Sequence, residues 1–433
     1  MNRSWTRDAD IPVLAECDVV VCGGGPAGCA AAIASARHGA ETLLLEKYGY
    51  LGGAAVAQLV SVVLSTNGVD FQGLWHEWAR RLHAYRAMPP LIRTPSRYNP
   101  DCHWFRTSVD PEGVKRVWDE MLEQVGADVL LLAHLCGASV EDGAITGVVA
   151  HTRAGMQQIR AARVIDATGD AAVAHEAGVA WDRGVVGKPW PQQVSLKRRI
   201  GGQPIPGTDG AKPLAGGGTV AWRPEAIGRV NRKRVDPLDP MALSAAVRDM
   251  QHEVWRRSDD LPEGEYLVDT AAEPGVRTSR IVQGIERVED DDAWNLRKRP
   301  DGIARSSWEI DVHPPDDEKP LPERWLHSGS EAYAEFARRL FAGEWFDIPC
   351  GCLVADGVDN LLVAGRCISA GYLAQGSLRI QQTCMATGEA AGVAAALSLR
   401  EGVSPRDLDP QIVVAQLAED RDVEPAFPSL REV

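Results

Sequence analysis

The first fifty residues contain two apolar runs separated by a stretch of small residues, a pattern that predicts a strand, a helix and a second strand. The apolar run Val19–Cys22 predicts a buried strand. A glycine-rich turn follows it, and the Ala-rich stretch beyond predicts a helix. Thr42–Leu45 is a second apolar run. Strand, helix and strand in this order are typical of the start of a doubly wound α/β domain.

Further along, apolar spacing predicts two amphipathic helices. Residues 73–85 form the first. The second begins at Asp110, whose side chain can cap a helix that has Pro111 in its first turn, and apolar positions from Val114 to Val125 continue it. Short β-rich runs separated by Gly-containing turns then follow, at 128–134, 136–141 and 145–151.

The turn after the first strand carries a dinucleotide fingerprint. Gly23 makes the tight turn, Gly25 lets backbone N–H groups approach a pyrophosphate, and Gly28 allows close helix-on-strand packing. The pyrophosphate is expected at the positive end of the helix. Glu46 ends the second strand, where a carboxylate accepts hydrogen bonds from ribose hydroxyls and disfavours a 2′-phosphate. The alternative is a glycine turn without a ligand, and the fingerprint alone does not separate NAD from FAD.

Three further segments, Lys47–Gly53, Val164–Asp170 and Asn360–Arg366, resemble the glutathione-reductase type of flavoprotein. Within that superfamily the chain resembles a narrower FAD-dependent oxidoreductase family, from about Cys17 to Gly402. The segments that carry this narrower resemblance are Gly275–Arg280, Ile310–His313 and Arg379–Gly392. The resemblance implies FAD as the cofactor, and its motifs are much less specific for a substrate.

The fold that the resemblance implies is α/β, with a Rossmann-like FAD-binding domain and an inserted α+β substrate domain. The FAD-binding domain combines a parallel sheet with an antiparallel meander, to which the runs from 128 to 151 are assigned. It is expected to be discontinuous, at 14–66, 108–182 and 350–402. The substrate or cap domain takes 67–107 and 183–349, and 403–433 is a C-terminal tail. Aromatic residues in 67–107 are interpreted as packing rather than as pocket lining.

The start of the last helix, at Ser377, Arg379 and Ile380, resembles the place where this family stabilises the reduced flavin. Arg366 is interpreted as a phosphate or ribityl partner, with a surface arginine as the alternative. The full set expected to bind the cofactor is Gly23, Gly25, Pro26, Ala27, Gly28, Glu46, Lys47, Gly52, Gly53, Cys136, Ala167, Thr168, Gly169, Asp170, Gly365, Arg366, Ser377, Arg379 and Ile380.

Composition agrees with an enzyme of this kind. The chain has 433 residues, enough for two domains, and a formal net charge of −14, which argues against nucleic acid as a partner. It contains no apolar run long enough to span a bilayer, and its first residues are polar, so a cytoplasmic location is expected. The nine cysteines lack metal-type spacing, so we expect reduced thiols and no metal site.

Three residues are candidates for substrate chemistry. His313 lies two residues after Asp311 in a strand-like run from Glu309, so both side chains would share one face. It is a candidate acid, base or substrate hydrogen-bonder, and the alternative is a loop histidine. Arg277 and Arg280 could hold a carboxylate bidentately, or could equally tie domains together by ion pairs.

Cysteines near the expected site leave two questions open. The segment before the C-terminal strand contains Cys350 and Cys352 where relatives have an aromatic residue and an arginine. The pair could relay electrons as thiols, although packing in a core is the more common use of such residues. Cys367 and Cys384 fall near the expected flavin wall, which leaves covalent attachment open.

The sequence therefore predicts an FAD-dependent oxidoreductase that dehydrogenates a small organic substrate by hydride transfer to flavin N5. Its electron acceptor, whether O2, a quinone or a redox protein, is not specified, and a homo-oligomer is possible. The alternatives are a reductase of an activated C=C bond and an FAD-containing electron-transfer subunit.

Overall fold

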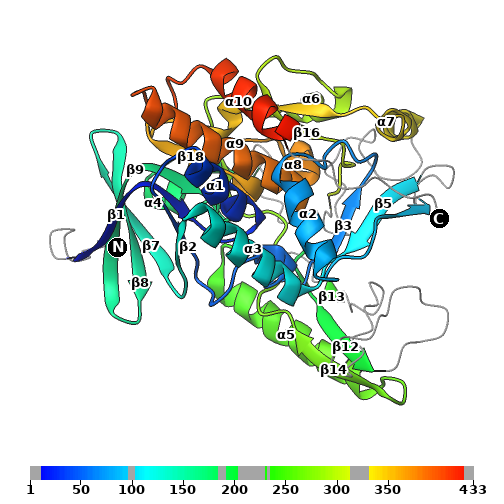
Figure 1. Cartoon of the computed structure of the whole chain (residues 1–433). Coiled ribbons are helices and arrows are strands. Elements are labelled where there is room, and N and C mark those ends of the chain that lie inside the picture. The colour runs from blue at the N-terminus through cyan, green and yellow to red at the C-terminus, as the bar shows by residue number, and fades with distance from the viewer. Residues whose placement is uncertain are drawn as a thin grey trace.

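The computed structural model describes residues 11–95, 103–183, 192–202, 230–231, 235–312 and 331–423, and is built around a mixed seven-stranded sheet (Figure 1). The strands run in the order β6-β2-β1-β9-β8-β7, and β18 also pairs with β9. Their bounds are β1 (Val13–Cys22), β2 (Thr42–Leu45), β6 (Asp128–Leu130), β7 (His134–Glu141), β8 (Ala144–Thr152), β9 (Gly155–Asp166) and β18 (Leu361–Val363). The mixed α/β architecture expected from the sequence is confirmed.

The parallel half of the sheet consists of β6, β2, β1, β9 and β18. Val19 pairs with Thr42 of β2, and Val20 pairs with Val164 of β9. On the other side of β9, Leu361 of β18 also pairs with Val164. β2, β18 and the last residues of β1 and β9 are buried apolar runs, as expected for the covered part of a parallel sheet.

The antiparallel meander is confirmed for β7, β8 and the first half of β9, but not for the run 128–134. In that run β6 pairs in parallel with β2, with Leu43 opposite Asp128. The reason is the preceding helix, α3 (Pro111–Val125), which returns the chain to the edge of the sheet as a crossover connection. Asp110 caps this helix as predicted, accepting a hydrogen bond from Gly113 N–H at 3.2 Å.

Two helices of small residues pack against each other beside the sheet. They are α1 (Pro26–Arg37) and α9 (Gln381–Arg400), which is buried along almost its entire length. A Cβ added at Gly388 would lie 2.0 Å from the carbonyl oxygen of Ala27, and one at Gly392 would lie 2.2 Å from that of Ala31. Glycine is therefore required on α9 for the two backbones to approach so closely.

The other helices cover the sheet or belong to the inserted segments. Their bounds are α2 (Leu74–Ala84), α4 (Ala172–Glu176), α5 (Pro240–Asp259), α6 (Asp290–Asn295), α7 (Glu331–Phe341), α8 (Tyr372–Leu378) and α10 (Pro410–Val423), with short 3₁₀ turns η2 (Gly53–Ala55), η4 (Cys350–Leu353) and η5 (Gly365–Cys367). The amphipathic helix predicted at 73–85 is confirmed as α2. In the segment predicted as a C-terminal tail, α10 packs on α9 and buries Val413 and Leu417.

The remaining strands form small sheets of their own, most of them in the segments expected to be inserted. Their strands are β3 (Val62–Ser65), β4 (Ile92–Pro95), β5 (His103–Ser108), β10 (Trp181–Asp182), β11 (Ser195–Leu196), β12 (Arg198–Gly202), β13 (Val230–Asn231), β14 (Glu265–Thr270), β15 (Ile281–Val282), β16 (Gly302–Ser306) and β17 (Phe346–Pro349). The β12–β14 pair and α5 lie away from the main sheet in Figure 1, over a second hydrophobic core that includes Met250 and Val254. The division into a cofactor domain and a cap domain stays a proposal.

The prediction of a strand at 309–313 was wrong for residues 309–312, the part that the structure describes. Regular pairing ends with β16 at Ser306, and residues 307–312 have no ladder partner. Packing fixes this segment instead, because a Cβ at Gly376 of α8 would meet the carbonyl oxygen of Asp311 at 3.1 Å.

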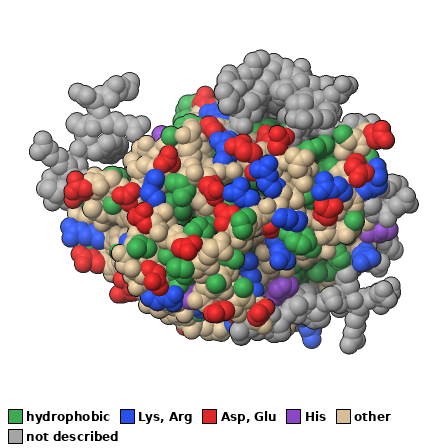
Figure 2. All heavy atoms as spheres, turned by 90° about the horizontal axis from the view of Figure 1, so that it is seen from above, with side chains coloured by type: hydrophobic (Ala, Val, Ile, Leu, Met, Phe, Trp, Pro, Cys, Tyr) green, Lys and Arg blue, Asp and Glu red, His purple; other side chains and the backbone are tan. Residues whose placement is uncertain are grey.

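On the face seen in Figure 2, acidic and basic side chains lie interspersed rather than gathered by sign. Among the described residues, no helix combines the length and the apolar character needed to cross a membrane.

Candidate functional site

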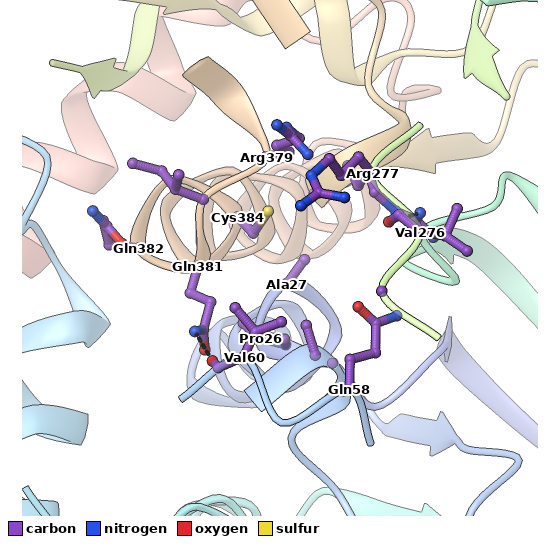
Figure 3. Close-up of a pocket in the computed structure, with 18 of the residues that line it drawn as sticks. Pro26, Ala27, Gln58, Val60, Val276, Arg277, Arg379, Gln381, Gln382 and Cys384 are labelled. Carbon is purple, nitrogen blue, oxygen red and sulfur yellow. Dashed lines mark hydrogen bonds between the residues drawn. The ribbon is translucent and has the colours of Figure 1, made fainter. Parts of the chain in front are cut away.

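A cavity of about 700 Å³ connects the glycine-rich loop after β1 with the inserted segments. Its walls come from the start of α1, the end of β9, the start of α9 and the β3-β5-β4 sheet. In Figure 3, Pro26 and Ala27 of α1 lie below the start of α9, and Arg277 and Arg379 lie above it. Segments that are hundreds of residues apart in the sequence therefore meet around one space.

The glycine-rich loop has the geometry that its spacing predicts. Gly23 has a φ of +106°, which favours glycine at the turn. A Cβ at Gly28 would lie 1.7 Å from the carbonyl oxygen of Gly23, so this residue serves packing. A Cβ at Gly25 would meet only the Cα of Gly53, at 3.8 Å, and would otherwise point into open space in the cavity. Backbone at Gly25 is thus open to close approach by a ligand.

The start of α1 is suited to an anion. Gly25 is its N-cap residue and supplies no side-chain cap, and Pro26 occupies the first turn. The N–H groups at such a helix end have no intrahelical acceptor, and the helix dipole adds positive potential there. A pyrophosphate at this end of the cavity would satisfy those donors.

Glu46 closes the loop from the end of β2. Its Oε2 accepts a hydrogen bond from Gly24 N–H at 2.6 Å, and its Oε1 accepts one from Tyr48 N–H at 2.9 Å. Burial raises the pKa of the carboxyl, although these two N–H donors oppose the shift. Glu46 also lines the cavity, so its carboxylate has lone pairs left for hydrogen bonds beyond those from Gly24 and Tyr48.

The end of β9 contributes a paired charge. Asp170 Oδ1 accepts hydrogen bonds from Arg366 Nη2 at 2.7 Å and from the Ser279 hydroxyl at 2.6 Å. Burial alone would raise the pKa of the Asp170 carboxyl, but the Arg366 guanidinium and the Ser279 hydroxyl lower it overall. Arg366 also donates to the carbonyl oxygen of Val276. Arg366 is therefore a held cavity residue and not a free surface arginine.

Two glutamines at the start of α9 attach that helix to β3. Gln381 Nε2 donates to the carbonyl oxygen of Val60 at 2.7 Å, the dashed contact in Figure 3. Gln382 Nε2 donates to the carbonyl oxygen of Leu64 at 2.6 Å and to Asp70 Oδ2 at 3.0 Å. Gln381 Oε1 is buried and has no hydrogen-bond partner among the described residues. It is an acceptor in the cavity wall that a bound molecule can satisfy.

Asp70→Asn is expected to remove a pH-dependent loss of stability. Burial raises the pKa of Asp70 from 3.8 to about 6, despite the Ser65 and Gln382 donors. The folded state thus binds this proton more tightly than the unfolded state, so the stabilisation is complete below pH 3.8 and is lost as pH rises through about 6. Urea unfolding across this range should show wild type losing about 3 kcal/mol relative to the variant.

The control for this prediction is Asp356→Asn, which changes an exposed carboxylate that pairs with Arg406 outside the cavity. Its pH profile should run parallel to that of wild type. A parallel profile for Asp70→Asn as well would show that Asp70 titrates alike in both states.

The β3-β5-β4 sheet forms another wall of the cavity. Leu64 pairs with Arg106, and Thr94 pairs with Trp104, so these side chains share the sheet face that lines the cavity. The Trp104 ring lies 5.8 Å from that of Trp308, and its Nε1–H donates to Glu309 Oε1 at 2.7 Å. The wall is therefore largely apolar, with one guanidinium in it.

The aromatic residues of the first insertion divide between packing and lining. Trp75 and Trp78 are buried in the core, as predicted, whereas Trp104 lines the cavity. Sequence reasoning also missed cavity residues that only the fold brings in. They are Ala54, Gln58, Val60, Val62, Leu64, Thr94, Arg106, Ser195, Lys197, Glu273 and Trp308. Asp311, Gln381 and Gln382 stand in segments that the sequence singled out, but they were given no role there. Alternation of Trp104 and Arg106 along β5 was the one available signal.

Most of the residues expected to bind the cofactor do line the cavity. They are Gly23, Gly25, Pro26, Ala27, Glu46, Lys47, Gly53, Ala167, Thr168, Gly169, Asp170, Gly365, Arg366, Arg379 and Ile380. Gly28 and Gly52 shape the loop from behind, and Gly52 N–H donates to Gly24 O at 2.8 Å. Ser377 donates to the carbonyl oxygen of Glu309 at 3.0 Å, away from the cavity. Cys136 lies in β7, where its thiol is 3.5 Å from the Val149 carbonyl oxygen.

Two of the three substrate candidates fall in the part of the chain that the structure describes, and they lie in different places. Arg277 lines the cavity and donates to the carbonyl oxygen of Gln193. Arg280 does not line it, since its Nη1 donates to Asp170 O at 2.9 Å and its guanidinium lies over the Trp181 ring. His313 lies outside the described residues.

Burial disfavours the thiolate form of the cysteines near the site. Burial raises the pKa of Cys350 to about 12 and that of Cys352 further above its ordinary value. Neither lines the cavity, and both belong to the main hydrophobic core. Cys384 does line the cavity, and burial raises its pKa to about 12. Only thiolates react readily, so these sites favour packing.

Comparison with known proteins gives the following similarities. The model of a family described as "FAD dependent oxidoreductase" matches residues 18–234 and 231–419. The chain is similar to digeranylgeranylglycerophospholipid reductase 2 of Methanopyrus kandleri, with 34% identity over 161 residues that make up 36% of this chain and 38% of that protein. It is also similar to reductase 1 of the same organism, with 31% identity over 36% of this chain and 40% of that protein.

The matches therefore span about two fifths of the length of these curated relatives. Among solved structures, p-nitrophenol 4-monooxygenase PnpA of Pseudomonas putida aligns over 94% of this chain and 85% of its own, with 13% identity and a TM-score of 0.48.

Proposed function

The chain belongs to the FAD dependent oxidoreductase family, and from that premise we propose that it dehydrogenates a small organic substrate. It is an enzyme of the oxidoreductase type whose cofactor is FAD. The observation that carries the proposed direction is the Asp311 carboxylate, which lines the part of the cavity beyond the glycine loop.

The cavity residues fit an extended dinucleotide. The α1 start and Gly25 would hold the pyrophosphate, Glu46 would bind the adenosine ribose, and the start of α9 would lie against the flavin. The orphaned acceptor Gln381 Oε1 and the uncapped α1 start are both groups that a bound cofactor or substrate would satisfy.

When bound, FAD supplies an acceptor for two electrons, which takes a hydride from the substrate at flavin N5. The chain's own part is to position the donor carbon and to remove a proton. A hydroxyl or amino carbon loses hydride more readily when a base takes up the proton of its heteroatom. Closing the cavity to bulk water would keep that proton transfer local.

Asp311 is the proposed base. Arg379 donates to its main-chain oxygen and, at 3.3 Å, to its Oδ2. The guanidinium holds the carboxylate at the cavity wall, where it can accept the proton of a substrate hydroxyl or amine as the hydride leaves. This placement is the support for dehydrogenation. His313 stays a sequence-based candidate for the same task.

The second candidate is a reductase of an activated C=C bond. Its support is the similarity to two curated proteins named as reductases, together with guanidinium groups of Arg277 and Arg379 in the cavity wall. In this reading the cations would bind the electron-withdrawing group of the substrate.

If the enzyme is instead a dehydrogenase, the electrons would pass from the reduced flavin to O2, a quinone or a redox protein.

Anaerobic absorbance spectroscopy of the FAD-loaded protein tests the proposal. Pooled alcohols, amines, amino acids and hydroxy acids should include a donor that bleaches the flavin band, and admission of air would separate an oxidase, which recolours fast, from a dehydrogenase. If no donor bleaches it, but enoates recolour the dithionite-reduced protein, dehydrogenation is wrong and the reductase is supported. A protein that takes up no FAD would contradict both.

A further inference from the structure

Arg106 presents a guanidinium to the cavity for which the described residues offer no partner. It lines the cavity from β5 and is partly buried, and its side chain makes no hydrogen bond or ion pair in the described part of the chain, although its main chain pairs within the sheet. The other cations that line the cavity all have contacts. These are Lys47 with Glu273, Arg277 with Gln193, Arg366 with Asp170, Arg379 with Asp311, and Lys197.

The carboxylates that line the cavity also have hydrogen-bond partners. Asp170 and Asp311 accept from arginines, Glu273 accepts from Lys47, and Glu46 accepts from two backbone N–H groups. No carboxylate of the cavity wall in the described residues is therefore left to neutralise Arg106. A partly buried guanidinium loses water contacts and gains from an anion that restores its hydrogen bonds.

Strand register places Arg106 close to the start of α9. Arg106 pairs directly with Leu64, whose carbonyl oxygen accepts from Gln382 of α9 at 2.6 Å. Arg106 is thus one strand away from the helix start that the family resemblance assigns to the flavin. The glycine loop and Arg366, which would hold the phosphates, belong to other walls of the cavity.

The surroundings of Arg106 define what kind of anion fits. On its sheet face lie Val62, Leu64 and Trp104, and Trp308 extends the same apolar surface. A highly hydrated ion such as free phosphate would gain nothing from these side chains. An anion joined to an alkyl or aromatic body would bury that body against them.

We propose that the substrate is a carboxylic acid with an apolar body, and that Arg106 binds its carboxylate. The inference rests on the proposed function only in taking this part of the cavity as the substrate site. The guanidinium presents two parallel N–H groups that match a carboxylate bidentately. Arg106 would then fix which end of the substrate lies near the start of α9.

Isothermal titration calorimetry of the FAD-loaded wild-type protein tests this without a variant. The ligands are phenylacetate, 3-phenylpropionate and hexanoate, each compared with its neutral amide. We expect saturable binding of at least one carboxylate that exceeds binding of its amide by roughly 10- to 100-fold, since a hydrogen bond to a charged group is lost. Equal binding of acid and amide, or no binding by any of the three acids, would overturn the proposal.

Arg106→Gln should remove the preference for acid over amide and leave amide binding unchanged. Arg106→Lys should retain part of the preference for acid over amide, because an ammonium keeps the positive charge but lacks the two parallel N–H groups of a guanidinium. The matched control is Arg93→Gln, which changes an exposed arginine on the opposite face of the same sheet, stacked on Phe105. This control should titrate like wild type.

The outcomes also separate this inference from the proposed direction of reaction. FAD content and thermal unfolding of each variant are measured first. If Arg106→Gln loses FAD while Arg93→Gln keeps it, Arg106 serves the cofactor and the inference is wrong. If the acid preference depends on Arg106 but no donor bleaches the flavin, the inference stands and dehydrogenation fails.

Discussion

Asp311→Asn is expected to slow anaerobic flavin reduction by the identified substrate by about 10²- to 10⁴-fold, the range typical of a lost general base. Asparagine is nearly the same size and keeps an oxygen that can accept from Arg379, so FAD content and thermal unfolding should stay close to wild type. What is lost is the capacity to take up a proton. Stopped-flow absorbance of the flavin band measures the effect directly.

The pH dependence separates a base from a merely structural carboxylate. Wild type should lose activity towards acid pH as the base becomes protonated, and Asp311→Asn should lack that limb of the profile. Asp356→Asn, an ion-paired carboxylate outside the cavity, is the control and should reduce at the wild-type rate. A variant at Asp311 that keeps the wild-type rate and acid limb would remove this residue from the mechanism.

Gly28→Ala and Gly25→Ala should fail in different ways although they lie three residues apart. At Gly28 the added Cβ would be 1.7 Å from a backbone oxygen, which no side-chain rotation relieves. We expect destabilisation by more than about 3 kcal/mol, measured by thermal or urea unfolding, and little soluble protein. At Gly25 the same methyl group would point into the cavity and meet only Gly53 at 3.8 Å.

Gly25→Ala should therefore fold, with at most about 1 kcal/mol lost from a poorer helix cap. Its FAD affinity should fall at least about tenfold, because the methyl group occupies the approach to the backbone. Fluorescence titration of the apoprotein with FAD gives this value. A Gly25→Ala protein that binds FAD as tightly as wild type would show that the pyrophosphate does not approach at this residue.

Sequence alone predicted the geometry of the glycine loop and its surroundings, because local rules govern it. The turn at Gly23, the packing at Gly28 and the carboxylate at Glu46 are imposed by short-range geometry that residue spacing reveals. The misassigned meander strand, β6, shows where such rules end. A short β-rich run carries no mark of its partner, and the crossover through α3 decided that β6 lies beside β2.

The β3-β5-β4 wall of the cavity was not predictable in the same way. In the sequence, Arg106 and Trp104 look like ordinary strand residues. They line the cavity only because β5 pairs with β3 and β4 to form one of its walls. Arg280 is a residue that often binds anions, yet here its guanidinium contacts Asp170 and Trp181 and does not line the cavity. Tertiary packing determines which arginine faces the cavity, and this packing cannot be predicted from a single sequence.

Close packing of α1 against α9 has a consequence for biosynthesis. The N-terminal unit is translated first, but α9, which covers α1 and completes the cavity, begins only at Gln381. At translation rates of roughly 5–20 residues per second, the interval between them is on the order of tens of seconds. Throughout that time α1 lacks the helix that packs against it in the folded protein. The wall of the cavity that α9 supplies is therefore completed late in synthesis.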